Sequence, residues 1–292
     1  MSLVRVLLSI FAVVAISPSG VIADPDAVRM KGATEIDLED VPYLAAIVVE
    51  ESDGIHCVAS KIGPNVLVTA AHCLTVSKNE PMAVSDVYVY MDIGNGWFSK
   101  ISVVGIEIHS NYLNVKNGSD IALMFLASHY DTPDIGIFKG DVDSPTGTLY
   151  SWGPTDPDSA VPINPVKRHV GIPSNEECHK AFKEALGVSI LSSMICAGPD
   201  ENENISESGD SGGPLTVRGD DGKEYLVGVG SYVRNKSLNY PYYTVLTLVS
   251  YYAEWIKETI ATESEHSTAA EYFTAAEANS NFGGCFSNIL GL

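Results

Sequence analysis

The sequence predicts an all-β protein that is closed by one helix. Many short apolar runs rich in β-branched residues occur after residue 24, and glycine, proline, asparagine or aspartate separates them. Short strands between turn residues are typical of a sandwich or barrel rather than of alternating strands and helices. The runs that predict strands are Leu44–Val49, Val66–Thr69, Val87–Met91, Ile101–Ile108, Ile121–Leu126 and Leu226–Val233.

Helical spacing is confined to one segment, Val249–Thr259. Its apolar residues recur at intervals that share one face of a helix. They are Tyr252, Trp255, Ile256 and, one residue beyond, Ile260. After about Ala261 this spacing stops until the final NFGGCFSNILGL, so residues 262–292 are predicted to form a loosely ordered tail.

Composition sets limits on size and partners. A chain of 292 residues with 45% hydrophobic content can bury the core of one large domain or two small barrels. The formal net charge of −20, with only 17 lysines and arginines, leaves no basic surplus to displace counterions from phosphates. We therefore expect no nucleic-acid partner.

The N-terminal residues predict export. Arg5 precedes an apolar run from Val6 to Ile16, and small residues end at Ala23, so residues 1–23 are predicted to be a signal peptide. The run is shorter than the ~20 residues that span a bilayer. We expect a secreted, extracellular protein with no membrane attachment after cleavage. Three sequons predict glycosylation, at Asn117, Asn204 and Asn235.

A glycine-rich turn, ESGDSGGPL at Glu207–Leu215, contains the candidate nucleophile Ser211. Glycines on both sides let the backbone approach a substrate without obstruction by side chains. An ordinary turn would explain SGG alone, but the six-residue run GDSGGP favours a catalytic serine.

Two further stretches supply partners for a serine. VLVTAAHC at Val66–Cys73 ends an apolar run beside His72, whose ordinary pKa suits a general base. NGSDIAL at Asn117–Leu123 places Asp120 at the start of a strand, where burial against an imidazole would fix its tautomer.

Together these stretches resemble the chymotrypsin/trypsin family of serine peptidases, which has the same chain order of histidine, aspartate and serine. The resemblance runs from about Met30 to Ala261, so residues 30–261 are predicted to be the peptidase domain. It implies two antiparallel six-stranded β-barrels, with His72 and Asp120 on the first and Ser211 on the second. Further family-like stretches are VPYLAAI (41–47), HSNY (109–112), SWG (151–153) and MICAG (194–198).

The resemblance also implies a mechanism. Ser211 attacks a peptide carbonyl, His72 takes and returns the proton, and Asp120 orients His72. Backbone N–H groups of Gly209 and Ser211 stabilise the oxyanion, and Ser231 supports the aspartate. The segment that includes Tyr232 and Val233 pairs with the backbone of a protein or peptide substrate. No metal or organic cofactor is expected.

Activation is implied by the short segment 24–29. Cleavage after Arg29 by an activating protease would free Met30, whose ammonium would pair with Asp210 and order the oxyanion turn. The family usually has two β-branched residues and then two glycines there, and this chain departs from that pattern at Lys31 and Ala33.

The cysteines match the family in part. The resemblance implies two disulfides, with Cys57 bonded to Cys73 and Cys178 to Cys196. Glu207 stands where the first cysteine of the specificity-pocket bridge is usual, and the fifth cysteine, Cys285, has no evident partner.

Specificity follows from the pocket positions. Trypsin-like members have an aspartate six residues before the nucleophile, whereas this chain has Ile205. Val233 and one of the residues 241–243 replace wall glycines and narrow the pocket. We expect cleavage after small or aliphatic residues. Val58 and Ala59 replace two glycines near the nucleophile, which predicts a shifted floor.

Two alternatives remain open at this point. One is a secreted protein of the same fold with little turnover, which acts as an inhibitor or adhesion module. The other is an α/β-hydrolase esterase, because residues 209–213 fit G-x-S-x-G. Its histidine would have to be His266, in the polar tail, and no strand–helix alternation surrounds the motif.

Overall fold

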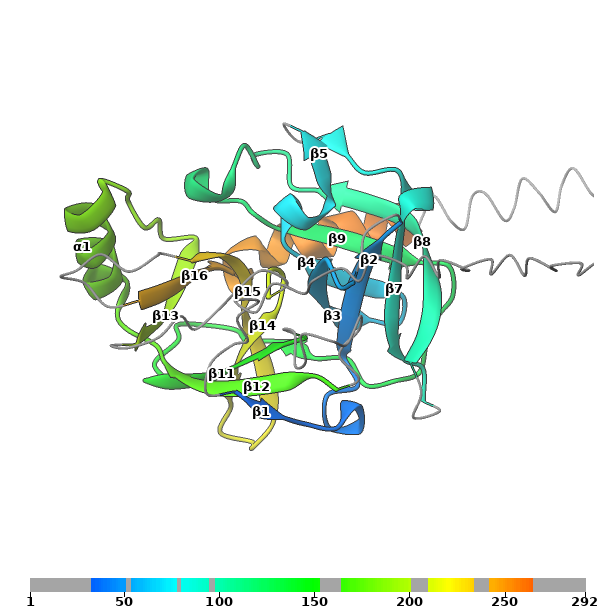
Figure 1. Cartoon of the computed structure of the whole chain (residues 1–292), viewed down its shortest axis with the longest axis horizontal. Helices are drawn as coiled ribbons and strands as arrows, with labels where there is room; N and C mark the ends of the chain where they lie inside the picture. Colours follow the sequence, from blue (N-terminus) through cyan, green and yellow to red (C-terminus); the bar gives the residue numbers. More distant parts are fainter. Residues whose placement is uncertain are drawn as a thin grey trace, which may run out of the picture.

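The computed structural model describes residues 33–50, 54–77, 80–94, 98–152, 164–200, 210–233 and 242–264. The predicted signal peptide, the activation segment and most of the predicted tail lie outside these ranges. Two β-sheets lie side by side, with helix α1 at one end and a closed barrel at the other (Figure 1). The C-terminal helix, orange in the figure, follows the last strand of the second sheet.

The first sheet is a closed barrel of six antiparallel strands, here called barrel 1. Their spatial order is β2-β3-β4-β9-β8-β7. The predicted runs at Leu44–Val49 and Val66–Thr69 match two of these strands at both ends. The bounds are β2 Leu44–Val49, β3 Cys57–Gly63, β4 Val66–Thr69, β7 Val87–Asp92, β8 Phe98–Ile108 and β9 Ala122–Leu126. A separate hairpin pairs β5 (Thr75–Ser77) with β6 (Glu80–Pro81).

The second sheet has eight strands and is open within the described residues, so the prediction of a second closed six-stranded barrel is not confirmed. Strand β13, at one edge of the sheet, and strand β12, next to β1 at the other edge, approach without pairing: a Cβ at Gly171 would meet the carbonyl oxygen of Gly198 at 2.8 Å. The main path is β1-β12-β11-β14-β15-β16-β13, and β10 pairs with β15. The bounds are β1 Thr34–Glu35, β10 Gly136–Ile137, β11 Thr146–Ser151, β12 Val166–Gly171, β13 Met194–Asp200, β14 Pro214–Arg218, β15 Glu224–Val233 and β16 Tyr242–Leu248.

The predicted C-terminal helix begins as the 3-10 helix η5 (Val249–Tyr252) and continues as an α-helix over 253–264. It therefore extends three residues past the predicted domain boundary at 261. Ile256 is buried on barrel 1, and Trp255 and Ile260 pack beside it. The apolar spacing read from the sequence is the face that covers the barrel.

A second helix, α1 (Asn175–Leu186), was not predicted, so the expectation of a single helix is wrong. Its apolar face is short: Cys178 and Phe182 are fully buried, and Ala181 packs beside them. The sequence signal for this helix lies in its capping residues. Ser174 accepts a hydrogen bond from the N–H of Glu177, and Gly187 ends the helix in the left-handed conformation, with φ 67°.

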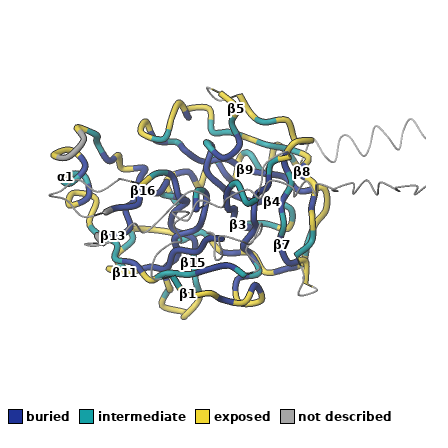
Figure 2. The backbone as a smooth tube through the Cα atoms, viewed as in Figure 1, coloured by how far each residue is buried: buried dark blue, intermediate teal, exposed yellow. Residues whose placement is uncertain are grey.

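The core is divided between the two sheets. One large cluster fills barrel 1 and reaches Tyr150, Trp152 and the C-terminal helix. Smaller clusters lie within the second sheet and beneath α1. Buried positions follow the strands, and exposed positions gather on loops and at the outer end of α1 (Figure 2). This rigid frame holds the connecting segments from which the candidate site is built.

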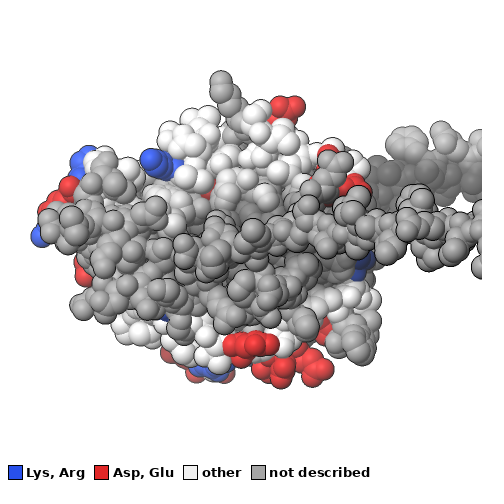
Figure 3. All heavy atoms as spheres, in the orientation of Figure 1, with Lys and Arg blue, Asp and Glu red and all other residues white. Residues whose placement is uncertain are grey.

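Acidic residues outnumber basic residues in the sequence, by 37 to 17. On the face shown in Figure 3 they gather near β1 and the 3-10 helix η1 (Leu38–Asp40), while basic side chains are few. None of the helices in the described ranges combines the length and apolar character that crossing a membrane requires.

Candidate active site

Two features of barrel 1 hold His72 in place: the end of strand β4 just before it and a disulfide at the next residue. Strand β4 ends at Thr69, and the chain turns into the 3-10 helix η2 (Ala71–Leu74), which contains His72. Cys73 is bonded to Cys57 on β3, as the resemblance implied. The imidazole keeps 24% of its surface exposed, so it can meet a substrate.

Asp120 is buried behind His72. Its Oδ1 accepts the backbone N–H of His72 at 2.9 Å, and its Oδ2 lies 2.8 Å from Nδ1 of the same residue. A carboxylate can only accept, so this contact selects the tautomer with the proton on Nδ1 and leaves Nε2 able to take a proton. Ser231 also donates its hydroxyl to Oδ2. The carboxylate is 1% exposed.

The turn at Ser211 packs directly on barrel 1. The carbonyl oxygen of Ser211 accepts the N–H of Val58 at 2.8 Å. Gly212 has φ 79°, and a Cβ there would lie 2.1 Å from the carbonyl oxygen of Val58 and 2.3 Å from Oγ1 of Thr69, so only glycine fits. Val58 neighbours Cys57 and Thr69 precedes η2, so the serine turn meets barrel 1 within a few residues of His72. Within the described ranges the Ser211 hydroxyl makes no hydrogen bond.

Val58 and Ala59 do not obstruct this contact. Both side chains are fully buried in barrel 1, and the backbone of Val58 faces the serine turn. The side chains that stand where the family has glycines therefore pack into the core of barrel 1.

Asp210 is 6% exposed and accepts the hydroxyl of Ser151 on its carboxylate. Its carbonyl accepts the N–H of Gly213 at 3.0 Å. Ser151 belongs to the SWG stretch, so two family-like motifs meet here. The predicted cleavage position at Arg29, the predicted partner Met30 and the predicted oxyanion donor Gly209 lie outside the described residues.

Strand β15 contains three of the predicted substrate-binding residues, Ser231, Tyr232 and Val233. The Ser231 hydroxyl donates a hydrogen bond to Asp120, and Val233 is 39% exposed at the end of the strand. Tyr232 packs edge-on against Phe182, and burial raises the pKa of Tyr232 to about 12. Tyr243, from the predicted wall segment, is buried in the cluster beneath α1. Ile205 lies outside the described residues.

The second disulfide joins Cys178 on α1 to Cys196 on β13, which ties the helix to the sheet. Asn117 is exposed at the end of the 3-10 helix η4 (Val115–Asn117). Glu207 and Cys285 are outside the described residues, as are the sequons at Asn204 and Asn235.

Burial and nearby charge control two more titratable groups. Burial raises the pKa of Tyr112 to about 12, and the negative charge of Asp120 adds to the effect. Burial lowers the pKa of His56, and His72 lowers it further, although a hydrogen bond to the carbonyl of Cys73 opposes this. His56 is therefore neutral at pH 7 and adds no positive charge beside His72.

Sequence reasoning missed Thr247. Its Oγ1 on β16 donates to the carbonyl oxygen of Asp120 at 2.8 Å. No local pattern marks this threonine, because the contact joins residues 127 positions apart.

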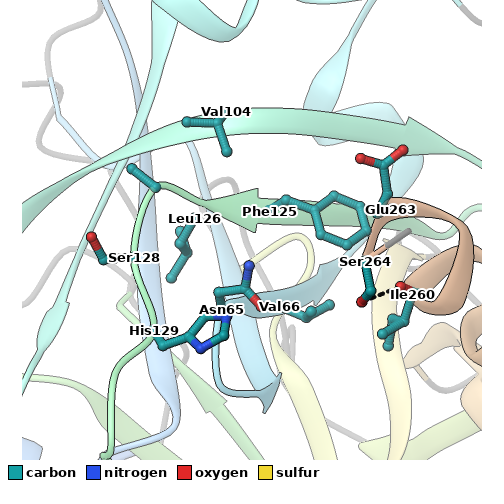
Figure 4. Close-up of a pocket in the computed structure, with 11 residues that line it drawn as sticks. Asn65, Val66, Val104, Phe125, Leu126, Ser128, His129, Ile260, Glu263 and Ser264 are labelled. Atoms are coloured by element: carbon teal, nitrogen blue, oxygen red, sulfur yellow. Dashed lines mark hydrogen bonds between the residues drawn. The ribbon is translucent and has the colours of Figure 1, made fainter. Parts of the chain in front are cut away.

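One group of possible metal ligands occurs among the described residues, at Cys57, His72 and Cys73. The two sulfurs are joined in a disulfide, so neither is a thiolate ligand. A cavity of about 530 Å³ lies elsewhere, between barrel 1 and the C-terminal helix, where Val104, Phe125 and Ile260 line it (Figure 4). It contains none of the predicted catalytic residues.

Comparisons with known proteins agree with this geometry. The sequence model of the Trypsin family matches residues 30–256. Trypsin of Saccharopolyspora erythraea is 27% identical over 205 residues, which cover 69% of this chain and 85% of the relative. Chymotrypsin-like elastase family member 3B of Macaca mulatta is 30% identical over 232 residues, which cover 75% of this chain and 89% of the relative. Transmembrane protease serine 11G of Mus musculus is 29% identical and covers 80% of this chain and 56% of the relative. The chain belongs to the chymotrypsin/trypsin family of serine peptidases.

Proposed function

We propose that this protein is a secreted serine endopeptidase whose nucleophile is Ser211. The observation that carries the proposal is the contact of one buried carboxylate, Asp120, with both the backbone and Nδ1 of His72. His72 is then ready to accept the proton of Ser211 as the hydroxyl attacks a peptide carbonyl.

The reaction proceeds in two halves. Attack by Ser211 forms a tetrahedral intermediate, and its collapse expels the amine, which takes the proton from His72. Water, deprotonated by His72, then hydrolyses the acyl-enzyme and restores the serine. The N–H groups of Gly209 and Ser211 are the proposed oxyanion donors.

The zymogen proposal rests on Asp210. Its buried carboxylate lies beside the serine turn, where an ammonium released by cleavage after Arg29 would stabilise the charge. An activating protease is the implied partner, and export through residues 1–23 is the proposed route.

Small or aliphatic side chains are the proposed residues before the cleaved bond. Ile205 offers no charge to lysine or arginine, and Val233 places a branched side chain at the end of β15. A protein that binds without turnover is not favoured, because the three catalytic residue types and Asp210 are all present.

The test uses the full chain secreted from a eukaryotic host, with and without cleavage after Arg29, and a mixed peptide library. Hydrolysis after alanine, valine or similar residues is expected from the cleaved protein and not from its Ser211→Ala variant. Preferred hydrolysis after lysine or arginine would contradict the specificity, and equal hydrolysis by both proteins would contradict the nucleophile.

A further inference from the structure

Two hydrogen bonds join the C-terminal helical segment to the residue before Asp120. The backbone N–H of Ser119 donates to the hydroxyl oxygen of Tyr252 at 3.0 Å, and the Tyr252 hydroxyl donates to Oγ of Ser119 at 3.2 Å. One hydroxyl therefore holds both the backbone and the side chain of the same residue, across 133 positions of sequence.

Ser119 needs such an anchor. Its φ of 57° is in the left-handed region, and no other non-glycine residue within the described ranges has a positive φ. An L-residue adopts this conformation only when its surroundings fix it. The N–H of Ile121 donates to the carbonyl oxygen of Ser119 at 2.9 Å, so Asp120 lies at the middle of a tight turn. The backbone of Ser119 thus sets the direction of the Asp120 carboxylate.

The ring of Tyr252 is itself held in place. It is 4% exposed, and its centroid lies 5.0 Å from that of His109 and 5.1 Å from that of Tyr251, both in edge-on contacts. His109 follows β8, and its ring centroid also lies 4.9 Å from that of Trp255. Aromatic contacts on two sides restrict the ring, so its hydroxyl stays directed at Ser119.

Thr247 anchors the other side of the turn through the carbonyl of Asp120. The backbone is then fixed before and after the aspartate, while His72 and Ser231 bind the carboxylate. Of these contacts, the pair to Tyr252 is the one that holds the left-handed residue.

We propose that Tyr252 is a positioning residue for the catalytic aspartate: its hydroxyl holds Ser119 in the conformation that directs Asp120 at His72. The inference rests on the proposed function, since it assigns Asp120 a catalytic role. Tyr252 acts only through Ser119.

The variant Tyr252→Phe removes the hydroxyl and keeps the ring. We expect kcat to fall about tenfold with KM unchanged, because misdirection of the carboxylate weakens the chemical step and not substrate binding. Tyr251→Phe is the matched control, since the neighbouring Tyr251 ring is 59% exposed, and its kcat should equal that of the wild type. Ser119→Ala removes only the Oγ contact and should cause a smaller loss.

A second measurement does not need turnover. In protein labelled with ¹⁵N-histidine, the proton between Nδ1 of His72 and Asp120 should give a low-field resonance. We expect this resonance to shift or broaden in Tyr252→Phe and to persist in Tyr251→Phe. If the wild type hydrolyses nothing while the resonance shows this pattern, the positioning role stands and the proposed peptidase activity fails.

The proposal is overturned if folded Tyr252→Phe keeps both the resonance and kcat of the wild type. Equal loss in Tyr251→Phe also overturns it, because the loss would then not be specific to the hydroxyl that contacts Ser119. If Tyr252→Phe does not fold, Ser119→Ala decides, and an unchanged resonance in that variant counts against the proposal.

Discussion

At the scale of single residues, the carboxylate of Asp120 is held by three donors. The backbone and Nδ1 of His72 occupy its two oxygens, and the Ser231 hydroxyl adds a third contact. In a water-excluded site these contacts are stronger than they would be at the surface. In the proposed mechanism, the activity therefore depends on the charge of Asp120 as well as on the shape of the site.

Replacement of that charge should stop the reaction and leave the fold intact. Asp120→Asn presents an amide N–H₂ or carbonyl to Nδ1 and no longer selects the required tautomer. We expect kcat to fall by the roughly 10⁴-fold that the same replacement costs in the family's worked example. Peptide hydrolysis by the folded variant, verified by circular dichroism, is the measurement. A loss below about tenfold would show that His72 does not depend on Asp120.

A buried lysine offers a stability test. Lys61 is 1% exposed, and its Nζ donates to the carbonyl of Thr132 at 2.8 Å and pairs with Asp134, which is 39% exposed. Asp134→Ala leaves an uncompensated buried ammonium and should lower the free energy of unfolding by about 2–3 kcal/mol, whereas Lys61→Met should cost about 1 kcal/mol or less. Urea titration compares them, and equal losses would contradict this explanation.

At the scale of elements, α1 depends on its ends more than on its apolar face. The hydroxyl of Ser174 accepts the N–H of Glu177 at 3.2 Å, and two glutamates follow in the first turn, where the helix dipole favours negative charge. Cys178 then ties the helix to β13.

Loss of this cap should destabilise the protein modestly. Ser174→Ala is expected to lower the free energy of unfolding by about 1 kcal/mol. Ser192→Ala, at an exposed serine in the segment before β13, is the matched control and should change it by less than about 0.5 kcal/mol. Thermal or urea unfolding decides, and equal effects would mean that the cap contributes nothing specific.

Strands and catalytic candidates could be predicted because their signals are local. Apolar runs bounded by turn residues located β2 and β4, and the stretches around His72, Asp120 and Ser211 indicated the candidate site. Helix α1 was missed because only two of its described residues, Cys178 and Phe182, are fully buried, and two residues are too few to show a helical repeat of apolar side chains. The contacts of Thr247 and Tyr252 with the turn at Asp120 depend on tertiary packing, so no local pattern contains them.

At the scale of the whole molecule, a polar cluster joins the two sheets. Glu224 on β15 accepts the hydroxyl of Tyr150 on β11 at 2.8 Å and that of Tyr43, beside β2, at 3.3 Å. Burial raises the pKa of both tyrosines, and the carboxylate of Glu224 adds to the rise. The cluster couples barrel 1 to the second sheet, and the candidate site lies across the same boundary.

This cluster predicts a loss of stability at alkaline pH. The folded pKa of Tyr43 and Tyr150 is above the unfolded value of about 10, so the folded state retains protons that the unfolded state releases. The stabilisation is complete below pH ~10 and decreases as the pH rises above it. Urea titrations between about pH 8 and about pH 11 should therefore show a shallower decline in Tyr43→Phe than in the wild type. Tyr251→Phe is the control, and an identical decline in all three proteins would contradict the prediction.

The central claim is that Ser211 is a nucleophile activated by His72 and Asp120. Labelling with an active-site phosphonate, followed by mass spectrometry of the digested protein, tests it most directly. We predict one phosphonyl group per chain, located on the peptide that contains Ser211, and no labelling of Ser211→Ala or Asp120→Asn under the same conditions. Correctly cleaved, folded wild-type protein that remains unlabelled, or that carries the label on another residue, would contradict the claim.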